Sequence, residues 1–292
     1  MAELILEGGA MRAGFVAGAL MALMDNGLTD FDRGLAVSAS VPTLAYFASG
    51  QRKEIEEVWR LELCSSDLVC YHNLPATSLA LSIKRPIIDI QHLVYDVFKE
   101  KYPLNIKNLF ESRMDCRFAL TQAPQGSLVL VRPADYNIYE IFKAALAVPG
   151  CYPGTVCLGG FEFIDGGTVN PLPARLWSDE GVEKIICILS KPLDCKSESL
   201  NLIERILFFR YFMKYDWVLG RLEEAGKTYQ HEISYLERLA KEEPARAFII
   251  HPERMPRAGF ITRDLKKINS TIDMGYRQVE KLVDQIRDFL EE

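Results

Sequence analysis

Short apolar runs alternate along the chain with longer stretches in which apolar positions recur at helical spacing. The short runs predict buried strands over residues 4–6, 35–37, 117–121, 128–131, 161–164, 184–189 and 248–250. The longer stretches predict helices over 13–26, from about Pro42 to Gly50, and over 53–63, 136–147, 200–241 and 271–290. Strands that alternate with helices in this way are typical of an α/β layer fold.

A weak boundary is expected near residues 194–199, where polar residues separate the α/β pattern from long, mostly helical sequence. The late apolar run 248–250 needs partner strands, and the sheet formed by the first two thirds of the chain is their expected source. We therefore predict one domain over 1–292, with an α/β core (1–195) and a mainly helical C-terminal part (196–292) packed on it.

Composition narrows the classes of function. The 292 residues are 49% hydrophobic and 25% charged, which is typical of a globular protein whose core needs no metal or disulfide support. The net charge of −6 and the absence of a long basic block argue against a nucleic-acid partner. No run of 18 apolar residues occurs, so any membrane contact is expected to be peripheral. No oligomeric state follows from the sequence.

The seven cysteines are odd in number and include no C-x-x-C pair. This pattern suggests neither a disulfide framework nor a zinc site. The apolar run near the first residue is too short for a signal peptide, and charged residues lie on both sides of it. Together these observations predict a reducing, cytoplasmic location.

A glycine-rich turn, GGAMRAG at residues 8–14, lies between a predicted strand and a predicted helix. Backbone N–H groups at such a helix start can stabilise an anion. The anion could be a dinucleotide pyrophosphate, a nucleotide phosphate or the oxyanion of an acyl-transfer intermediate. Tight packing of helix on strand is the alternative without a ligand.

Ser38 stands where an apolar strand should turn into a helix, in the segment AVSASVP (36–42). A nucleophile elbow strains the serine backbone and brings the residues at −2 and +2 close together, so both must be small. Here they are Ala36 and Ser40, where the usual G-x-S-x-G motif has glycine. The alternative is a serine that caps the helix.

Asp165 ends an apolar run and is followed by Gly166 and Gly167, in the segment FIDGGTVNP (163–171). By itself an Asp-Gly pair is also typical of a type I′ hairpin turn. The chain order, however, is glycine-rich turn, then Ser38, then Asp165, and this order suggests one combined site.

The three segments together resemble the patatin-like phospholipase family of serine acyl hydrolases. Segment 8–13 is similar to the family's oxyanion loop with its arginine, 36–40 to its nucleophile elbow, and 165–167 to its Asp-Gly-Gly/Ala motif. Further similarity lies at 144–153 and 170–173, and a bacterial subgroup is resembled at 252–254, 262–264 and 273–276. The resemblance implies a central, mostly parallel sheet flanked by helices in three layers.

The resemblance also implies a mechanism in which Asp165 deprotonates Ser38, which attacks the ester of a lipid-like substrate to form an acyl-enzyme. The oxyanion would be held by amides of the loop, which are those of Gly8, Gly9, Ala10 and Met11. Arg12 would brace the loop or meet a substrate phosphate. The implied mechanism uses no histidine, metal or cofactor.

Four family glycines are replaced, at Ala10, Ala13, Ala36 and Ser40. Where a position needs a positive φ, alanine costs about 1–2 kcal/mol. The alternative function is therefore a catalytically silent module that binds acyl chains or a protein partner. A nucleotide-binding protein that uses the loop 8–14 is a third interpretation.

The segment 206–217 is aromatic and mildly basic. We expect it to pack on the α/β core. An amphipathic lid at a lipid interface is the alternative.

Overall fold

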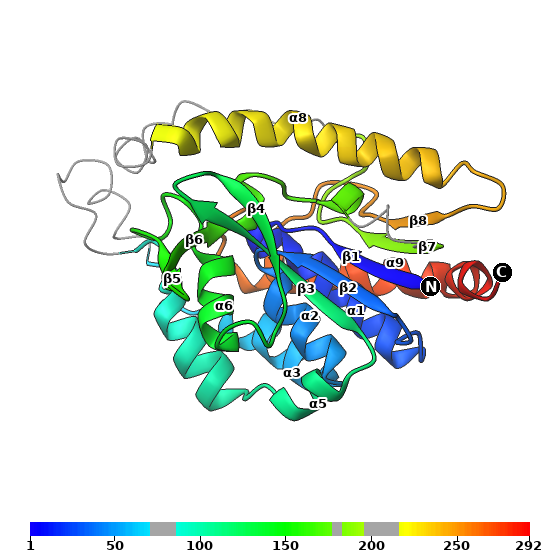
Figure 1. Cartoon of the computed structure of the whole chain (residues 1–292). Coiled ribbons are helices and arrows are strands. Elements are labelled where there is room, and N and C mark those ends of the chain that lie inside the picture. Colours follow the sequence, from blue (N-terminus) through cyan, green and yellow to red (C-terminus); the bar gives the residue numbers. More distant parts are fainter. Residues whose placement is uncertain (71–85, 177–182, 196–215) are drawn as a thin grey trace.

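A computed structural model describes residues 1–70, 86–176, 183–195 and 216–292 (Figure 1). Within them, one eight-stranded sheet is formed by β1 (Ala2–Leu6), β2 (Arg33–Val37), β3 (Asp115–Ala123), β4 (Ser127–Val131), β5 (Val156–Leu158), β6 (Phe161–Asp165), β7 (Lys184–Ile188) and β8 (Ala247–Ile250). The α-helices are α1 (Gly14–Asp25), α2 (Ser40–Ala48), α3 (Arg52–Glu57), α5 (Ile106–Glu111), α6 (Ile138–Leu146), α8 (Asp216–Leu239) and α9 (Leu265–Glu291). Shorter or wider helical segments are η1 (Ala10–Ala13), η2 (Val58–Glu62), η3 (His92–Lys101), η4 (Gly166–Thr168) and η5 (Ala174–Leu176).

The strand order is β5-β6-β3-β2-β1-β7-β8, with β4 paired to β3. Neighbouring strands in the part β3-β2-β1-β7-β8 are parallel. Strands β4 and β6 pair antiparallel with β3, and β5 pairs antiparallel with β6. The predicted α/β fold with a mostly parallel sheet is therefore confirmed. Of the three antiparallel strands, β4 and β6 were expected from the sequence and β5 was not.

Alternate residues of the central strands enter two different cores, because side chains in a strand alternate between the two faces. Leu4 and Leu6 pack in the core beneath α1, α2, α6 and α9. Ile5 between them packs in a second core with Tyr229 and Leu236 of α8. Figure 1 shows α8 across one face of the sheet and the other α-helices of the described residues on the opposite side, which gives the three expected layers.

Strand β3 pairs with two different strands along one edge. β2 runs parallel to its first half and ends with Val37 opposite Ala119, whereas β6 runs antiparallel to its second half and ends with Asp165 opposite Leu120. β4 pairs with residues 118–122, on both sides of this junction, and so occupies the other edge of β3. The carboxyl ends of β2 and β6 consequently point at each other along β3.

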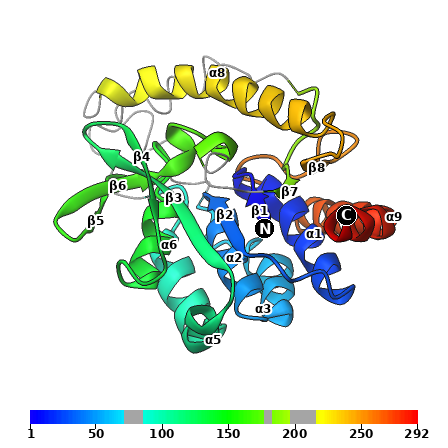
Figure 2. The same ribbon diagram turned by 45° about the vertical axis from the view of Figure 1, so that its right-hand side comes forward.

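Helices α1 and α9 pack unusually closely, side by side in the same layer (Figure 2). A Cβ at Gly18 would overlap the carbonyl group of Ile272, and a Cβ at Gly275 would overlap that of Phe15. α1 is buried along almost its whole length, which fits its uniformly apolar sequence. The C-terminal helix thus packs directly on the helix that follows the glycine-rich turn.

Several helix boundaries differ from expectation. α9 begins at Leu265 and not near residue 271, because the Asp264 side chain accepts hydrogen bonds from the N–H groups of Lys266 and Lys267 and caps the helix. The helix expected over 13–26 is preceded by η1, and that over 53–63 is split into α3 and η2. Helices η3 and α5 were not predicted.

The helix expected over 200–241 is described only as α8, Asp216–Leu239. All but the last two residues of the aromatic segment 206–217 lie outside the described residues, so its two interpretations remain predictions. In the described part of the chain, no helix has both the length and the apolar character of a membrane span.

Candidate active site

Ser38 occupies a strained turn between β2 and α2. Its φ is +58°, in the left-handed region that residues other than glycine rarely adopt, and its side chain is 6% exposed. The side chain does not cap α2, whose N-cap is Ala39, so the alternative of a capping serine is wrong. Ser40 donates from its hydroxyl to the carbonyl oxygen of Glu7 at 2.7 Å and thereby ties the end of β1 to the start of α2.

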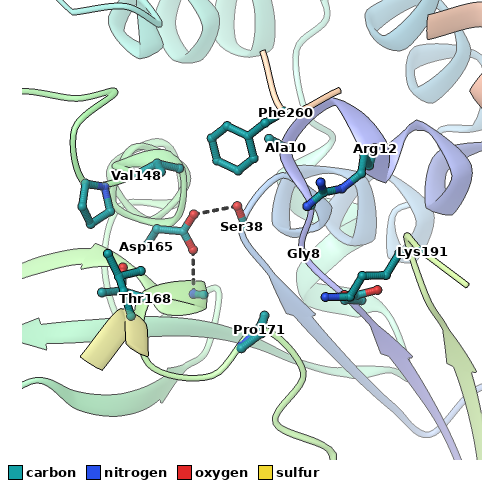
Figure 3. Close-up of a pocket in the computed structure, with 15 residues that line it drawn as sticks. Gly8, Ala10, Arg12, Ser38, Val148, Asp165, Thr168, Pro171, Lys191 and Phe260 are labelled. Atoms are coloured by element: carbon teal, nitrogen blue, oxygen red, sulfur yellow. Dashed lines mark hydrogen bonds and ion pairs between the residues drawn. The ribbon is translucent and has the colours of Figure 1, made fainter. Parts of the chain in front are cut away.

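Ser38 and Asp165 are in direct contact (Figure 3). The Ser38 hydroxyl donates to Asp165 Oδ2 at 2.6 Å, and the Gly167 N–H donates to Asp165 Oδ1 at 2.8 Å. Asp165 is followed by the short helix η4 and not by a hairpin turn, so the type I′ alternative is wrong. A Cβ at Gly166 would overlap the Ala119 carbonyl, which explains the glycine there as a need for space.

Burial determines the protonation of Asp165. Loss of solvent raises its pKa from the ordinary value of 3.8 to about 6, although the hydrogen bonds from Ser38 and Gly167 act in the opposite direction. At neutral pH the group is therefore a carboxylate, and a more basic one than an exposed aspartate. Such a group can accept a proton from the hydroxyl it already contacts.

The glycine-rich turn lies beside Ser38, because a Cβ at Gly8 would lie only 3.0 Å from Ser38 Cβ. The N–H of Gly8 donates to Pro171 O at 3.3 Å and that of Met11 to Phe260 O at 3.4 Å. Within the described residues, the N–H groups of Gly9 and Ala10 make no hydrogen bond. Of the four predicted oxyanion donors, these two are therefore available to a ligand.

Two of the replaced glycines differ in what their positions require. Ala10 has a φ of +48°, so its backbone is in the left-handed region. Ala13 has a φ of −64°, an ordinary helical value. The steric cost expected for alanine therefore applies at position 10 and not at position 13.

A pocket of about 210 Å³ opens beside Ser38 and Asp165. All the predicted site residues line it except Met11, Ala36, Ser40 and Gly166. Its other lining residues are Glu7, Val148, Pro149, Thr168, Pro171, Lys191, Leu222 and Phe260. The Thr168 hydroxyl is buried and has no hydrogen-bond partner in the described part of the protein.

A second, smaller cavity of about 50 Å³ shares Ala10, Ser38 and Val148 with this pocket. Its remaining walls are almost entirely apolar and are Met11, Ala39, Trp59, Leu63, Leu68, Ile88, Ile90, Leu93 and Leu146. Ser38 therefore lies between a mixed pocket and an apolar cavity.

Lys191, Glu7 and Thr168 were missed by the sequence analysis. Glu7, Ser38 and Lys191 follow the parallel strands β1, β2 and β7 within three residues. Since ligands in open parallel sheets bind at the carboxyl ends of the strands, this placement was the available signal. The sequence analysis found Ser38 through its elbow pattern and did not use the strand ends, so Glu7 and Lys191 were not considered.

Comparisons with known proteins identify the family of the chain and the likeness of its fold. The family model of patatin-like phospholipases matches residues 4–176. The uncharacterized protein YjjU of Escherichia coli (strain K12) is 25% identical over 194 residues, which are 65% of this chain and 52% of that protein. The chain thus spans about half the length of this curated relative.

The crystal structure of VipD from Legionella pneumophila is similar with a TM-score of 0.51 and 14% sequence identity, over 97% of this chain and 67% of that one. At this level of identity the likeness concerns the fold alone. The family model, in contrast, covers more than half of the chain and contains the glycine-rich turn, Ser38 and Asp165. The chain belongs to the patatin-like phospholipase family.

Proposed function

We propose that the protein is a serine acyl hydrolase that cleaves ester bonds of lipid-like substrates through Ser38 and Asp165. The observation that carries this proposal is the 2.6 Å hydrogen bond from Ser38 to Asp165 at the wall of a pocket. Membership of a family of lipid acyl hydrolases supports the class of substrate.

In the proposed reaction the Ser38 oxygen bonds to the ester carbonyl carbon while its proton passes to Asp165 Oδ2. The bond from that carbon to the alkoxy oxygen then breaks, and the leaving alcohol takes the proton from Asp165. Water next attacks the acyl-enzyme and gives a proton to Asp165, and this proton returns to Ser38 as the carboxylic acid leaves. Each step uses a group already within hydrogen-bond distance of Ser38.

The negative charge on the carbonyl oxygen needs donors that are free in the resting protein. The N–H groups of Gly9 and Ala10 meet this requirement, since neither makes a hydrogen bond in the described residues. We therefore narrow the proposed oxyanion site from four amides to these two. The apolar cavity beyond Ser38 would take the acyl chain.

Covalent labelling with a fluorophosphonate probe tests the proposal. The wild-type protein and a Ser127→Ala control, which changes an exposed serine on β4, should label on Ser38, and Ser38→Ala should not. Hydrolysis of short soluble acyl esters should follow the same pattern. A well-folded wild-type protein that neither labels nor hydrolyses esters would instead be the silent binding module.

We propose in addition that the whole chain forms one domain. This is supported by the pairing of β8 with β7 and by the packing of α9 on α1, which both connect the C-terminal part to the α/β core. We also propose a cytoplasmic location, which is supported by seven free cysteines, and expect any membrane contact to be peripheral.

A further inference from the structure

Ser190 is a fully buried serine that lies directly against the glycine-rich turn. It follows β7 by two residues, and its side chain has no exposed surface. A Cβ at Gly9 would lie 2.5 Å from Ser190 Oγ, just as a Cβ at Gly8 would lie 3.0 Å from Ser38 Cβ. Gly8 thus packs against the proposed nucleophile, and Gly9 packs against Ser190.

The Ser190 hydroxyl determines the orientation of one peptide group in the turn. It donates to the carbonyl oxygen of Gly8 at 2.9 Å. That oxygen and the Gly9 N–H belong to the same trans peptide group, which is planar, so they point in opposite directions. A hydrogen bond that holds the Gly8 oxygen toward Ser190 therefore turns the Gly9 N–H away from Ser190. This N–H is one of the two proposed oxyanion donors.

Ser190 is itself held by the buried side chain of Glu7. The Ser190 N–H donates to Glu7 Oε2 at 2.6 Å, and the Ser190 hydroxyl oxygen lies 3.1 Å from the same atom. The hydroxyl has one proton for two acceptors, and its shorter contact is the one to the Gly8 oxygen. The backbone hydrogen bond to Glu7 therefore fixes Ser190, while the hydroxyl proton is available to Gly8.

Two cations stabilise the carboxylate of Glu7 in this buried position. Burial raises the pKa of Glu7, and the charges of Lys191 and Arg12 oppose this rise. Lys191 Nζ lies 3.4 Å from Glu7 Oε1 and 3.6 Å from the centre of the Tyr229 ring. The attraction between Arg12 and Glu7 supports the predicted role of Arg12 in bracing the loop. Glu7 is thus a fixed support for Ser190.

The turn needs such a support because its backbone is strained next to Gly9. Ala10 has a φ of +48°, and a left-handed residue other than glycine persists only where its surroundings hold it. The N–H groups of Gly8 and Met11 are both bonded to backbone carbonyls, and Ser190 holds the Gly8 oxygen. These contacts fix the turn on both sides of the Gly9 and Ala10 amides, which make no hydrogen bond within the described residues.

We propose that Ser190 is a positioning residue of the oxyanion site. Its hydroxyl, held in place through Glu7, orients the Gly9 N–H toward the carbonyl oxygen of the ester that Ser38 attacks. In the view of Figure 3, the glycine-rich turn and Asp165 lie on opposite sides of Ser38, so the base and the oxyanion donors flank the nucleophile. This inference rests on the proposed function. An oxyanion donor acts mainly in the transition state, so a misplaced Gly9 N–H should lower kcat more than it changes KM.

Ser190→Ala tests the role of the hydroxyl, because it keeps the N–H that donates to Glu7. We expect kcat for a short soluble acyl ester to fall about tenfold per active site titrated with a fluorophosphonate, with KM changed by less than about twofold. The matched control is Ser49→Ala, since Ser49 is also buried and donates to a backbone oxygen, that of Tyr46, at 3.0 Å. Ser49→Ala should lower the melting temperature by a similar amount and leave kcat unchanged.

Inhibition by a trifluoromethyl ketone gives a readout that a loss of packing alone would not change. The Ser38 oxygen bonds to the ketone carbon, its proton passes to Asp165, and the former carbonyl oxygen becomes an oxyanion. In Ser190→Ala the affinity for this inhibitor should fall by about the same factor as kcat/KM. The corresponding secondary alcohol has no carbonyl group and should bind equally well to the variant and the wild type.

Three results would overturn the role of Ser190. The first is an unchanged kcat and inhibitor affinity in Ser190→Ala, the second is an equal loss of kcat in Ser49→Ala, and the third is a loss confined to KM or to the fraction of titrated sites. An active wild-type protein with any of these results rejects only the role of Ser190. A wild-type protein that neither labels nor hydrolyses esters rejects the hydrolase and this role together.

Discussion

The pocket loop and the crossing of α1 and α9 use small residues for opposite reasons. In the pocket, Ala10 and Ser38 have positive φ values although neither is glycine. At the helix crossing, Gly18 and Gly275 lie within ordinary helices, yet a Cβ at either would overlap a backbone carbonyl. The pocket thus has side chains at positions whose backbone conformation favours glycine. The helix crossing has an ordinary helical backbone but requires glycine because there is no space for a Cβ.

The difference shows that the loss of a motif glycine has no single meaning. A left-handed backbone costs alanine about 1–2 kcal/mol, which the surrounding packing can offset while the geometry is retained. An overlap with backbone atoms can be relieved only when two elements move apart. Ala10 is therefore compatible with an intact site. Gly166, which follows β6, is instead required for space, because a Cβ there would overlap backbone atoms.

The largest expected effect concerns the strained serine itself. Ser38→Ala and Asp165→Asn should each reduce ester hydrolysis by a factor on the order of 1,000 or more while the fold is retained, because the two groups act as one unit. The double variant should lose little more than either single one. Steady-state kinetics and circular dichroism measure both effects, and substantial turnover by Ser38→Ala would rule out Ser38 as the nucleophile.

The helix crossing should be the most sensitive place for stability. Gly275→Ala is expected to cost about 3 kcal/mol of unfolding free energy, because α1 and α9 must separate to admit the new Cβ. Gly220→Ala on α8 is the matched control, since nothing lies within 4 Å of a Cβ there. Gly220→Ala should raise stability by about 0.5–1 kcal/mol. Urea unfolding compares the two, and a change of the same sign in both would contradict the steric explanation.

The pH dependence of activity should reflect the burial of Asp165. Its pKa is raised to about 6, and a general base must be ionised, so kcat/KM should rise with pH up to about 6 and then level off. At pH 5 it should be about tenfold below its plateau.

The contribution of Asp165 to folding stability should change with pH in the opposite direction to the activity. Between its unfolded pKa of 3.8 and about 6 the folded protein binds more protons, so the Asp165 contribution to stability decreases as pH rises. An activity profile that stays flat down to pH 4 would mean that Asp165 is ionised throughout.

The smallest expected effect tests the strain at position 10. Ala10→Gly removes about 1–2 kcal/mol of left-handed strain, but glycine gives back about 0.5–1 kcal/mol through its greater freedom in the unfolded chain. The net gain in stability should be about 1 kcal/mol, with a modest rise in turnover. Ala13→Gly, at a helical φ of −64°, should lose about 1 kcal/mol. Thermal unfolding measures the change in melting temperature of the two variants. Equal changes in Ala10→Gly and Ala13→Gly would show that backbone conformation does not determine the effect of glycine.

The sequence predicted the parts of the fold in which local pattern and burial agree. Strands β1, β2 and β7 were found because parallel strands are apolar on both faces. Helices η3 and α5 were missed because they are short or irregular and mix apolar with charged residues. The start of α9 was misplaced because the capping role of Asp264 was not considered.

The part of the site that could be predicted from the sequence consists of residues that lie in recognisable local patterns. Ser38 and Asp165 stood out because each ends an apolar run and is followed by small residues. The Met11 N–H, next to Ala10, donates to the distant Phe260 carbonyl, and Lys191 contacts Glu7 and Tyr229, which carry no motif. No local pattern encodes such contacts.

Because β2 and β6 both align on β3, the distance between Ser38 and Asp165 is fixed by strand registers and not by the chain that connects them. Loops between residues 39 and 160 could therefore lengthen or shorten without moving either side chain, at the small entropic cost of a longer loop. A slip of β6 by one residue would instead displace Asp165 by about 3.3 Å and turn its side chain to the other face of the sheet. Insertions should accordingly be tolerated in the loops of this region and selected against within β3 and β6.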